Sequence, residues 1–289
     1  METKQKTRLP EFQGKPLIKI LEYIPQADFL RGNFGKAVLE ECRARVKEDY
    51  HDHDNLKVLR YNEEQNVVTG SNSFATSLVN KIIAEQGHIA TQAELERIIA
   101  LNRPDLNLRG HYEDTGLVLR SNEEHNSYLA NDLIAQLGNI ELPVLIPLKN
   151  LELRNDDNSP YGLAFNIIGE TIYAPILNHD SENFSSVDID EEIGIPKKLR
   201  QGNRFFYTRK KGLSRLYLGG DLDADAGDED LAGSGGDGRV VVVSGEAAKK
   251  NFVDLFKKIE TSYQAQLEEI EKRKEKALKE ALEIMQGKK

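Results

Sequence analysis

Residues 213–244 read LSRLYLGGDLDADAGDEDLAGSGGDGRVVVVS, and the middle of this stretch has a composition unlike the rest of the chain. Residues 219–238 include seven Gly, six Asp and one Glu, with no basic residue. Leu222, Ala224 and Ala226 alternate with aspartates. Because successive side chains of an extended chain point to opposite faces, the alternation predicts an apolar face that anchors the segment and a displayed carboxylate face. Residues 239–243, RVVVV, predict a buried strand that closes it.

Four interpretations of residues 219–238 remain open. The segment can be an ordinary solvated acidic loop. A calcium loop fits Asp221, Asp223 and Asp225 at its first, third and fifth positions, but Ala226 and Ala232 stand where such loops need Gly and Glu. GSGGDG matches a dinucleotide-binding pattern, yet it precedes a strand, opens no helix and carries a carboxylate. The fourth interpretation is a surface whose side chains are free to vary, so that the fold does not depend on them.

We call the positions of this segment that are predicted to point to solvent the display positions. The residue types at these positions favour the fourth interpretation. Asn is absent from residues 204–250, although it is frequent elsewhere in the chain. Replacing adenines of the Asn codons AAC and AAT by guanine yields only Asp, Gly or Ser, the residues that stand at the display positions. The segment therefore has the composition expected of Asn codons altered at their adenines.

The remaining sequence places helical patterns first and strand patterns later. Helices are predicted over 33–50, 71–86 and 126–137, and over a further segment from the capping box of Thr91 and Glu94 to about Leu101, which Pro104 terminates. Strands are predicted within 56–69, 117–119, 143–148, 151–154, 162–168, 171–177, 204–208 and 239–243. This order predicts an α+β fold with a mixed or antiparallel sheet. An apolar stripe at helical spacing predicts a C-terminal helix, which divides the chain into domains 1–245 and 246–289.

Composition excludes several classes of protein. The 289 residues are 39% hydrophobic and carry a net charge of -9, which is typical of a globular protein and disfavours nucleic-acid binding. No apolar run reaches the length of a membrane span, and residues 1–15 lack an apolar signal core. We therefore expect synthesis in the cytoplasm without membrane insertion; a final place on a virion surface or outside the cell stays open. The single cysteine, Cys42, excludes an intramolecular disulfide.

No other motif predicts chemistry. The acidic and histidine-containing stretch 49–54, DYHDHD, is better explained as a solvated helix end than as a metal site, because no further ligand set accompanies it. No nucleophile–base or paired-carboxylate arrangement can be placed. We therefore predict no enzymatic activity, no catalytic residue, no metal and no cofactor.

On residues 213–244, together with TGSNSF, LRGHYEDTGLVLRS, SPYGLAF and IYAPILN, the chain resembles the variable proteins of diversity-generating retroelements, of the type found in archaea and their viruses. GSNSFATSLVNKIIAEQGHIATQAELERII is similar to the two-helix part of lectin-like domains related to formylglycine-generating enzymes. Cys42 stands alone, so only the fold of those enzymes is carried over. The resemblance implies an α+β, C-type lectin-like domain, and a reverse transcriptase that miscopies template adenines and rewrites residues 213–244.

The resemblance also implies which positions vary and which form the framework. The variable, ligand-binding positions are Tyr217, Gly219, Gly220, Asp221, Asp223, Asp225, Gly227, Asp228, Asp230, Gly233, Gly235, Gly236 and Asp237. The framework positions are Leu218, Leu222, Leu231, Ser234, Gly238 and Arg239. This division agrees with the alternation of apolar and acidic residues described above.

The implied function is attachment to a host or partner surface ligand, either a protein or a glycan. The acidic segment favours a basic ligand, whose association should slow with added salt. We expect a monomer. Two alternatives stay open: a virion assembly component that uses the C-terminal helix, and a divergent lectin-fold enzyme with a pocket beneath the segment.

Overall fold

The computed structural model describes residues 9–17, 26–244 and 272–274. The chain separates into two units, one of residues 1–20 and 25–245 and the other of residues 21–24 and 246–289. The predicted C-terminal helix lies outside the described residues except for 272–274, which are helical. Within the described ranges, no helix combines the length and the apolar character needed to cross a membrane.

The four longer helices of the first unit lie where the sequence predicts them. They are α1 (Gly32–Asp49), α2 (Ser73–Ile83), α3 (Gln92–Leu101) and α4 (Ser127–Leu137). The predicted capping box of α3 is formed, since the Thr91 hydroxyl accepts from the Glu94 amide and the Glu94 carboxylate accepts from the Thr91 amide. The helix ends at Leu101, as predicted, three residues before Pro104. Its C-cap is Asn102, whose left-handed conformation (φ 45°) ends the helical path.

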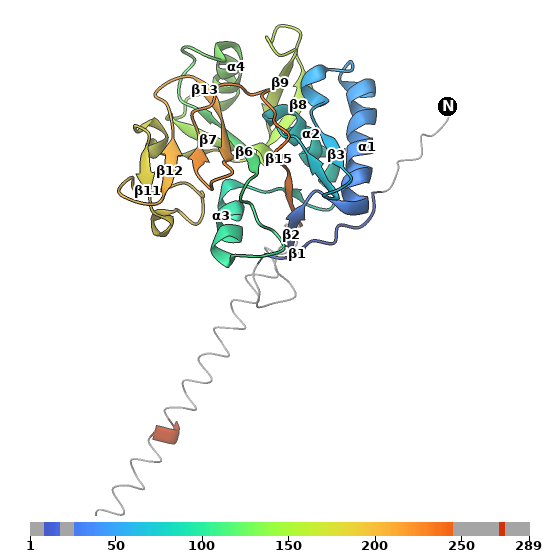
Figure 1. The fold of residues 1–289 in the computed structure, drawn as a ribbon. Coiled ribbons are helices and arrows are strands. Elements are labelled where there is room, and N and C mark those ends of the chain that lie inside the picture. Colours follow the sequence, from blue (N-terminus) through green and yellow to red (C-terminus); the bar gives the residue numbers. More distant parts are fainter. Residues whose placement is uncertain (1–8, 18–25, 245–271, 275–289) are drawn as a thin grey trace, which may run out of the picture. The chain divides into compact units, whose positions relative to one another are not determined.

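The main sheet is mixed and curled, which confirms the predicted α+β class (Figure 1). Its strand order is β10 (Ile172–Tyr173), β7 (Val144–Pro147), β6 (Tyr112–Leu119), β13 (Leu213–Leu218), β14 (Ala224–Asp225), β12 (Arg204–Tyr207) and β11 (Glu182–Phe184). In addition, β15 (Gly238–Arg239) pairs with β6. The β12–β14 and β15–β6 pairs are parallel, and the other pairs of this sheet are antiparallel.

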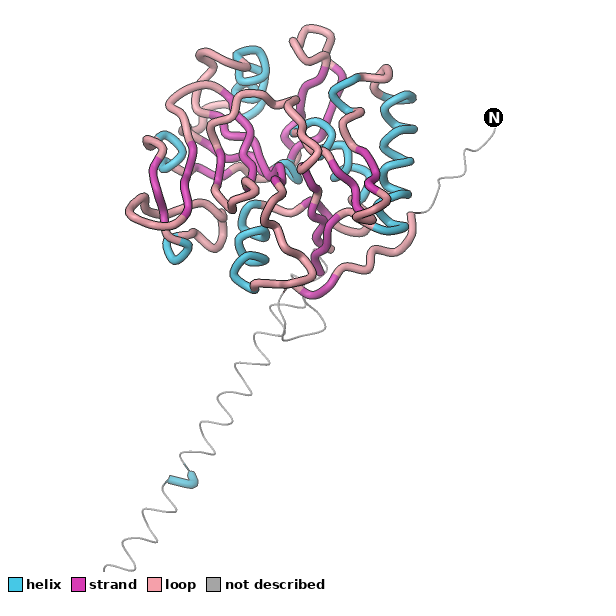
Figure 2. The backbone as a smooth tube through the Cα atoms, viewed as in Figure 1, coloured by secondary structure: helices cyan, strands magenta, loops and turns pink. Residues whose placement is uncertain are grey.

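A smaller sheet and two hairpins complete the unit (Figure 2). The smaller sheet has the order β1 (Lys15–Pro16), β2 (Gln26–Phe29), β16 (Val241–Val243) and β5 (His88–Ile89). One hairpin joins β3 (Arg60–Asn62) to β4 (Val67–Thr69), as predicted for 56–69, and the other joins β8 (Leu151–Asn155) to β9 (Leu163–Ile167). Short 3-10 turns cover Asp54–Leu56, Leu148–Asn150, Pro175–Asn178 and Ser186–Asp188.

Two apolar clusters hold these elements together. The larger cluster joins α1, α2 and α4 to the sheets, and the stacked rings of Phe74 and Phe165 lie within it, 5.1 Å apart. The smaller cluster contains Phe206, Ala224 and Ala226. The acidic segment is therefore built into the sheet and its second core, because β14 lies between β13 and β12.

Candidate ligand-binding site

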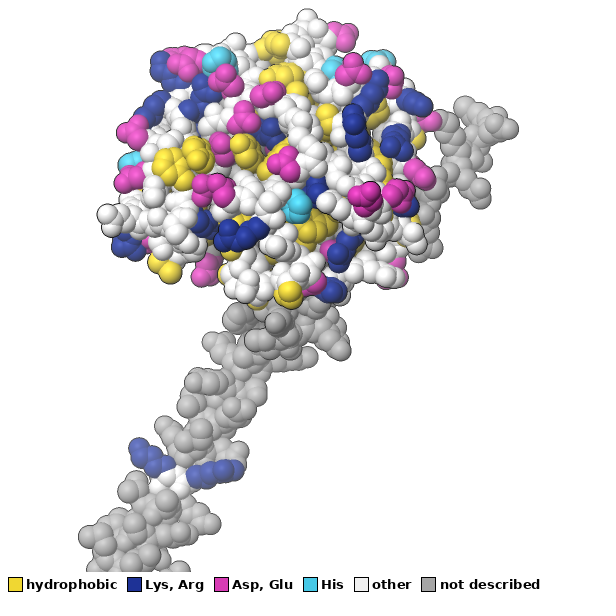
Figure 3. Space-filling view, viewed as in Figure 1, with side chains coloured by type: hydrophobic (Ala, Val, Ile, Leu, Met, Phe, Trp, Pro, Cys, Tyr) yellow, Lys and Arg dark blue, Asp and Glu magenta, His cyan; other side chains and the backbone are white. Residues whose placement is uncertain are grey.

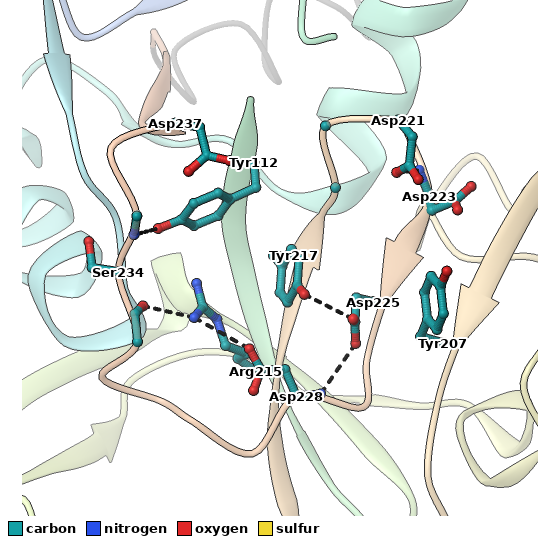
Figure 4. Close-up of a pocket in the computed structure, with 14 residues that line it drawn as sticks. Tyr112, Tyr207, Arg215, Tyr217, Asp221, Asp223, Asp225, Asp228, Ser234 and Asp237 are labelled. Atoms are coloured by element: carbon teal, nitrogen blue, oxygen red, sulfur yellow. Dashed lines mark hydrogen bonds and ion pairs between the residues drawn. The ribbon is translucent and has the colours of Figure 1, made fainter. Parts of the chain in front are cut away.

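An open pocket of about 520 Å³ lies along the acidic segment (Figure 4). Most of the positions that the resemblance marks as variable line it: Tyr217, Gly219, Gly220, Asp221, Asp223, Asp225, Asp228, Gly233, Gly235 and Asp237. Gly227, Asp230 and Gly236 are not among the lining residues. The pocket is completed by Tyr112, Tyr207 and Arg215, which the sequence analysis did not single out, and by Ser234, which it placed in the framework.

The predicted alternation of anchored and displayed side chains is present in the segment. Leu222, Ala224 and Ala226 are buried, with 7%, 0% and 0% of their surface exposed. Asp221, which precedes them, is exposed, and Asp223 and Asp225, which lie between them, are half-buried. At β14 the extended backbone produces this pattern, because successive side chains leave opposite faces of the sheet. Leu222 is instead buried from a turn, where its φ is 72°.

The framework positions are buried with one exception. Leu218 and Leu231 are fully buried, and Gly238 and Arg239 are buried as well. Ser234 is exposed, but its hydroxyl accepts a hydrogen bond from the Ser71 amide at 3.2 Å. A hydrogen bond, and not burial, therefore connects Ser234 to the segment before α2.

Several of the displayed aspartates also make hydrogen bonds within the protein. Asp225 Oδ1 accepts from the amides of Gly227 and Asp228 at 2.7 and 3.2 Å, and Oδ2 accepts from Tyr217 Oη at 2.9 Å. Asp223 Oδ1 accepts from the Phe205 amide at 2.6 Å. Short carboxylate side chains readily cap amides of turns and of neighbouring backbone, so these groups hold local geometry while bordering the pocket.

Buried arginines hold the segment by its main chain. Arg204 Nε donates to the Leu222 carbonyl at 2.5 Å, and Arg120 Nη2 donates to the Ala226 carbonyl at 2.8 Å. Both side chains are at most 5% exposed. Because every residue has a backbone carbonyl, these hydrogen bonds do not depend on which side chain stands at the accepting position.

Arg215 is the third of these anchors and lies at the pocket lining. Its Nη1 donates to the carbonyl of Gly233 at 2.9 Å, and its Nη2 lies 2.6 Å from Asp114 Oδ1 in a buried ion pair. The guanidinium also lies 4.8 Å from the centre of the Tyr217 ring. Burial alone would lower the pKa of Arg215, but the carboxylates of Asp114 and Asp228 raise it above its ordinary value. The buried carboxylate of Asp114 thus neutralises the positive charge of Arg215.

These anchoring arginines could have been recognised in the sequence by their context. Arg120, Arg204 and Arg215 stand at the ends or in the middle of apolar strands, in GLVLR, RFFY and LSRLYL. A charged side chain is rarely buried in such a strand without a partner. The pattern marks each arginine as a buried anchor, although it does not reveal which carbonyls they bind.

The pocket has a net negative character and aromatic walls. Asp221, Asp223 and Asp237 border it beside the rings of the three tyrosines (Figure 4). Burial, together with the neighbouring Asp221, raises the pKa of Asp223, and burial raises the pKa of Asp225. Figure 3 shows acidic side chains set among apolar and uncharged groups on this face of the molecule. Such a pocket stabilises a cation better than an anion.

Glu113 lies behind this pocket, on the face of β6 opposite to Tyr112 and Asp114. It is 2% exposed, and neither carboxylate oxygen has a hydrogen-bond partner among the described residues. Burial raises the pKa of Glu113 well above its ordinary value, although the nearby Arg239 opposes the shift. Folding therefore favours the protonated form of this side chain.

The glycines of the segment differ in the space around them. None of those at variable positions has a positive φ, so the backbone conformation does not require glycine there. A Cβ added to Gly236 meets no atom within 4 Å, and one added to Gly227 makes ordinary contact at 3.5 Å. At Gly220 the nearest atom is the backbone carbonyl carbon of Gly110, at 3.3 Å, so a small shift is needed there.

Three further variable glycines are limited only by flexible side chains of the segment itself. At Gly219, Gly233 and Gly235 the closest atom to an added Cβ is an Asp carboxylate oxygen, at 3.1, 2.8 and 2.5 Å. The framework glycine, Gly238, is different. A Cβ there would lie 2.7 Å from Tyr112 Oη and 2.8 Å from the Ser71 backbone nitrogen. An added side chain at the implied variable glycines thus requires at most the movement of an Asp side chain or a small shift, whereas at framework Gly238 it would meet fixed backbone.

The alternative ion-binding interpretations find no support in the geometry. Across residues 9–17, 26–244 and 272–274, no group of three or more His, Cys, Asp or Glu side chains is placed to hold a metal ion. In the stretch 49–54, Asp52 and Asp54 instead pair with Lys57 at 2.8 and 3.0 Å. Asp221 and Asp223 accept backbone amides.

Similarity to known proteins does not indicate a function for this chain. Comparisons with protein-family models, with curated proteins and with solved structures give no match.

Proposed function

We propose that this chain is a hypervariable ligand-binding protein with a C-type lectin-like fold, whose residues 213–244 are rewritten at adenines by a retroelement. Its ligand is a group on a host or partner surface, taken up in the pocket beside the acidic segment. The observation that carries the proposal is the contrast among the glycines. At the implied variable glycines an added side chain meets open space, a flexible Asp side chain or a neighbour at 3.3 Å or more, whereas at framework Gly238 it meets the Ser71 backbone at 2.8 Å.

Main-chain anchoring supports the same proposal. Arg120, Arg204 and Arg215 bind backbone carbonyls of the segment, and the buried Leu222 and Leu231 hold it from below. A segment held in this way keeps its path when its displayed side chains change. Substitutions at exposed positions usually alter the free energy of unfolding by less than about 0.5 kcal/mol.

The aspartates that hold turns are compatible with adenine-directed change. Guanine substitutions in an Asn codon produce Asp, Ser or Gly, and Asn, Asp and Ser each have a side-chain oxygen that can accept the same amides. Asp225 is the position where this matters most, because its carboxylate accepts three hydrogen bonds. Changes from Asn to Asp or Ser at this position would therefore preserve the local turn.

The ligand chemistry follows from the pocket of this particular copy. Five aspartates border it, and Asp114 already neutralises the one arginine in its lining. Tyr207 is 44% exposed and lines the pocket together with Asp221 and Asp223. Burial, followed by the charges of Asp223 and Asp221, raises the pKa of its hydroxyl. Aromatic faces and carboxylates together bind amines and guanidinium groups. We therefore propose a ligand that presents Lys or Arg side chains, or a sugar amine.

Two libraries of the full chain test the proposal. The first randomises the thirteen variable positions, and the second randomises buried neighbours in the same segment: Leu218, Leu222, Ala224, Ala226 and Leu231. We expect most members of the first library to stay folded, as measured by protease resistance on a display system, and few of the second. Selection of the first library on unrelated ligands should yield binders. Equal loss of folded members in both libraries would refute the proposal.

The rewriting half of the proposal has its own test. The genome that encodes this chain should carry a near-copy of the coding segment for residues 213–244, close to a reverse transcriptase gene. The differences between the two copies should coincide with adenines of the near-copy. Differences spread evenly over all four bases would contradict adenine-specific rewriting while leaving the binding proposal standing.

A further inference from the structure

A second cavity, of about 400 Å³, lies between α1 and the segment that leads into β3. None of its lining residues lines the pocket of the acidic segment. Its lining divides into two chemical classes. Leu39, Cys42, Val46, Leu56 and Leu59 are apolar, and Arg43, Lys47, Asp52, Lys57 and Arg60 are charged. We call this cavity the α1 groove.

The apolar residues of the α1 groove form a fixed floor. All five are at most 5% exposed and belong to the larger core cluster. On α1, Leu39, Cys42 and Val46 follow each other at helical spacing, so they share one face of the helix. The floor is therefore part of the folded body and does not need a ligand to form.

The rim of the α1 groove carries positive charge that forms no ion pair with an acidic side chain of the described residues. Arg43, Lys47 and Arg60 are exposed and form no ion pair within the described part of the chain. On the same helix, Arg45 outside the groove pairs with Glu41 and Asp49. Figure 3 shows Lys and Arg side chains close together over the region of α1 and β3.

The like charges on the rim of the α1 groove repel each other, and a partner of opposite charge would relieve this repulsion. Arg43 and Lys47 stand four residues apart on one helix, a spacing at which like charges destabilise a helix. The chain as a whole has a net charge of -9, so the basic rim is a local exception. A ligand that places carboxylates at the rim and an apolar side chain on the floor would complement both parts of the groove.

We propose that the α1 groove is a second interaction surface, separate from the variable pocket, which binds an acidic segment of a partner protein. That segment carries a large apolar side chain with Asp or Glu on either side of it. A protein segment fits better than a nucleic acid, because the lining contains no aromatic ring on which a base could stack and its floor is apolar. The surface would thus join this chain to a constant partner while the variable pocket changes its ligand.

Fluorescence polarisation with the full chain tests this proposal. The probe is a labelled twelve-residue peptide in which Glu alternates with Leu and Phe, and we expect saturable binding. Replacing its Glu residues by Lys, or its Leu and Phe residues by Ser, should abolish that binding. The double variant R43E/K47E should weaken it about tenfold or more, because rim charges that attract the ligand become repulsive.

Two controls separate this effect from net charge and from misfolding. R109E/K198E makes the same change of net charge at two exposed side chains outside the groove, and it should bind the peptide like the parent chain. R60E changes the rim from β3, so it reports on the groove even if a change in α1 unfolds the helix. Thermal melts of each variant confirm that it is folded.

Cys42 supplies an independent readout. It is the only cysteine in the chain and lies on the groove floor, where burial raises the pKa of its thiol to about 12. Maleimide reaches a thiol this buried only when the protein opens locally, and bound peptide disfavours that opening. The peptide should therefore slow the labelling of Cys42 in the parent chain but not in R43E/K47E. Absence of saturable peptide binding, equal weakening by R109E/K198E, or displacement of the peptide by a single-stranded oligonucleotide would overturn the proposal.

Discussion

Replacing Gly238 by Ala should destabilise the protein, whereas the same change two residues earlier, at Gly236, should not. A methyl group at Gly238 would lie 2.7 Å from Tyr112 Oη and 2.8 Å from the Ser71 nitrogen, against an ordinary contact of about 3.4 Å or more. Overpacking of this kind costs about 1–3 kcal/mol. Displacing Tyr112 would also weaken the hydrogen bond between its hydroxyl and the Gly235 amide, worth about 0.5–1.5 kcal/mol.

The expected loss at Gly238→Ala is therefore about 2–4 kcal/mol of unfolding free energy. At Gly236→Ala the added methyl group meets nothing within 4 Å, and φ is not positive. The lower entropy of the unfolded chain then favours a gain of about 0.4–1 kcal/mol. The carbonyl of residue 236 remains available to Arg239 Nη1, which donates to it at 3.0 Å in the parent protein.

Urea unfolding followed by circular dichroism measures both variants, with tyrosine fluorescence as a second probe because the chain has no tryptophan. The midpoint should fall for Gly238→Ala and rise slightly for Gly236→Ala, with the slope m unchanged in both. Thermal midpoints should move by about 2–4 °C for each kcal/mol. Equal destabilisation of the two variants would show that the segment is packed uniformly, and the division into framework and variable positions would fail.

Three other results are expected. Arg215→Met should cost about 3–5 kcal/mol in urea unfolding because it leaves Asp114 buried without its ion-pair partner; Arg215→Met combined with Asp114→Asn should recover part of that loss. For Glu113, the raised pKa means that the folded state holds a proton which the unfolded state releases. The contribution of Glu113 to the free energy of unfolding should therefore fall as pH rises from about 4.5, and Glu113→Gln should remove that part of the pH dependence. An identical pH dependence in the parent and in Glu113→Gln would contradict the raised pKa of Glu113. A Lys-rich probe peptide should associate with the pocket more slowly in 0.5 M than in 0.05 M NaCl, and Asp221→Asn with Asp223→Asn should reduce this salt dependence; salt-independent binding would argue against a cationic ligand.

Local signals in the sequence predicted most of the helices and strands because those signals act over a few residues. The Thr91–Glu94 capping box and the apolar spacing of α1 depend on neighbours three or four positions away. The end of α3 at Leu101 was predicted as well, although the sequence did not indicate that Asn102 would form its C-cap. The short strand β14 was not predicted as a sheet member, because its place between β13 and β12 depends on residues distant in sequence.

The sequence by itself determined that residues 221–226 alternate between buried apolar side chains and more exposed aspartates, because apolar and acidic residues alternate there. It also determined the α+β class and the acidic character of the segment. Only the tertiary structure decided that Arg120, Arg204 and Arg215 hold this segment through its carbonyls, that Asp225 supports a turn, and that Gly238 has no room for a side chain. Those facts depend on which strands lie side by side, and long-range packing sets that arrangement.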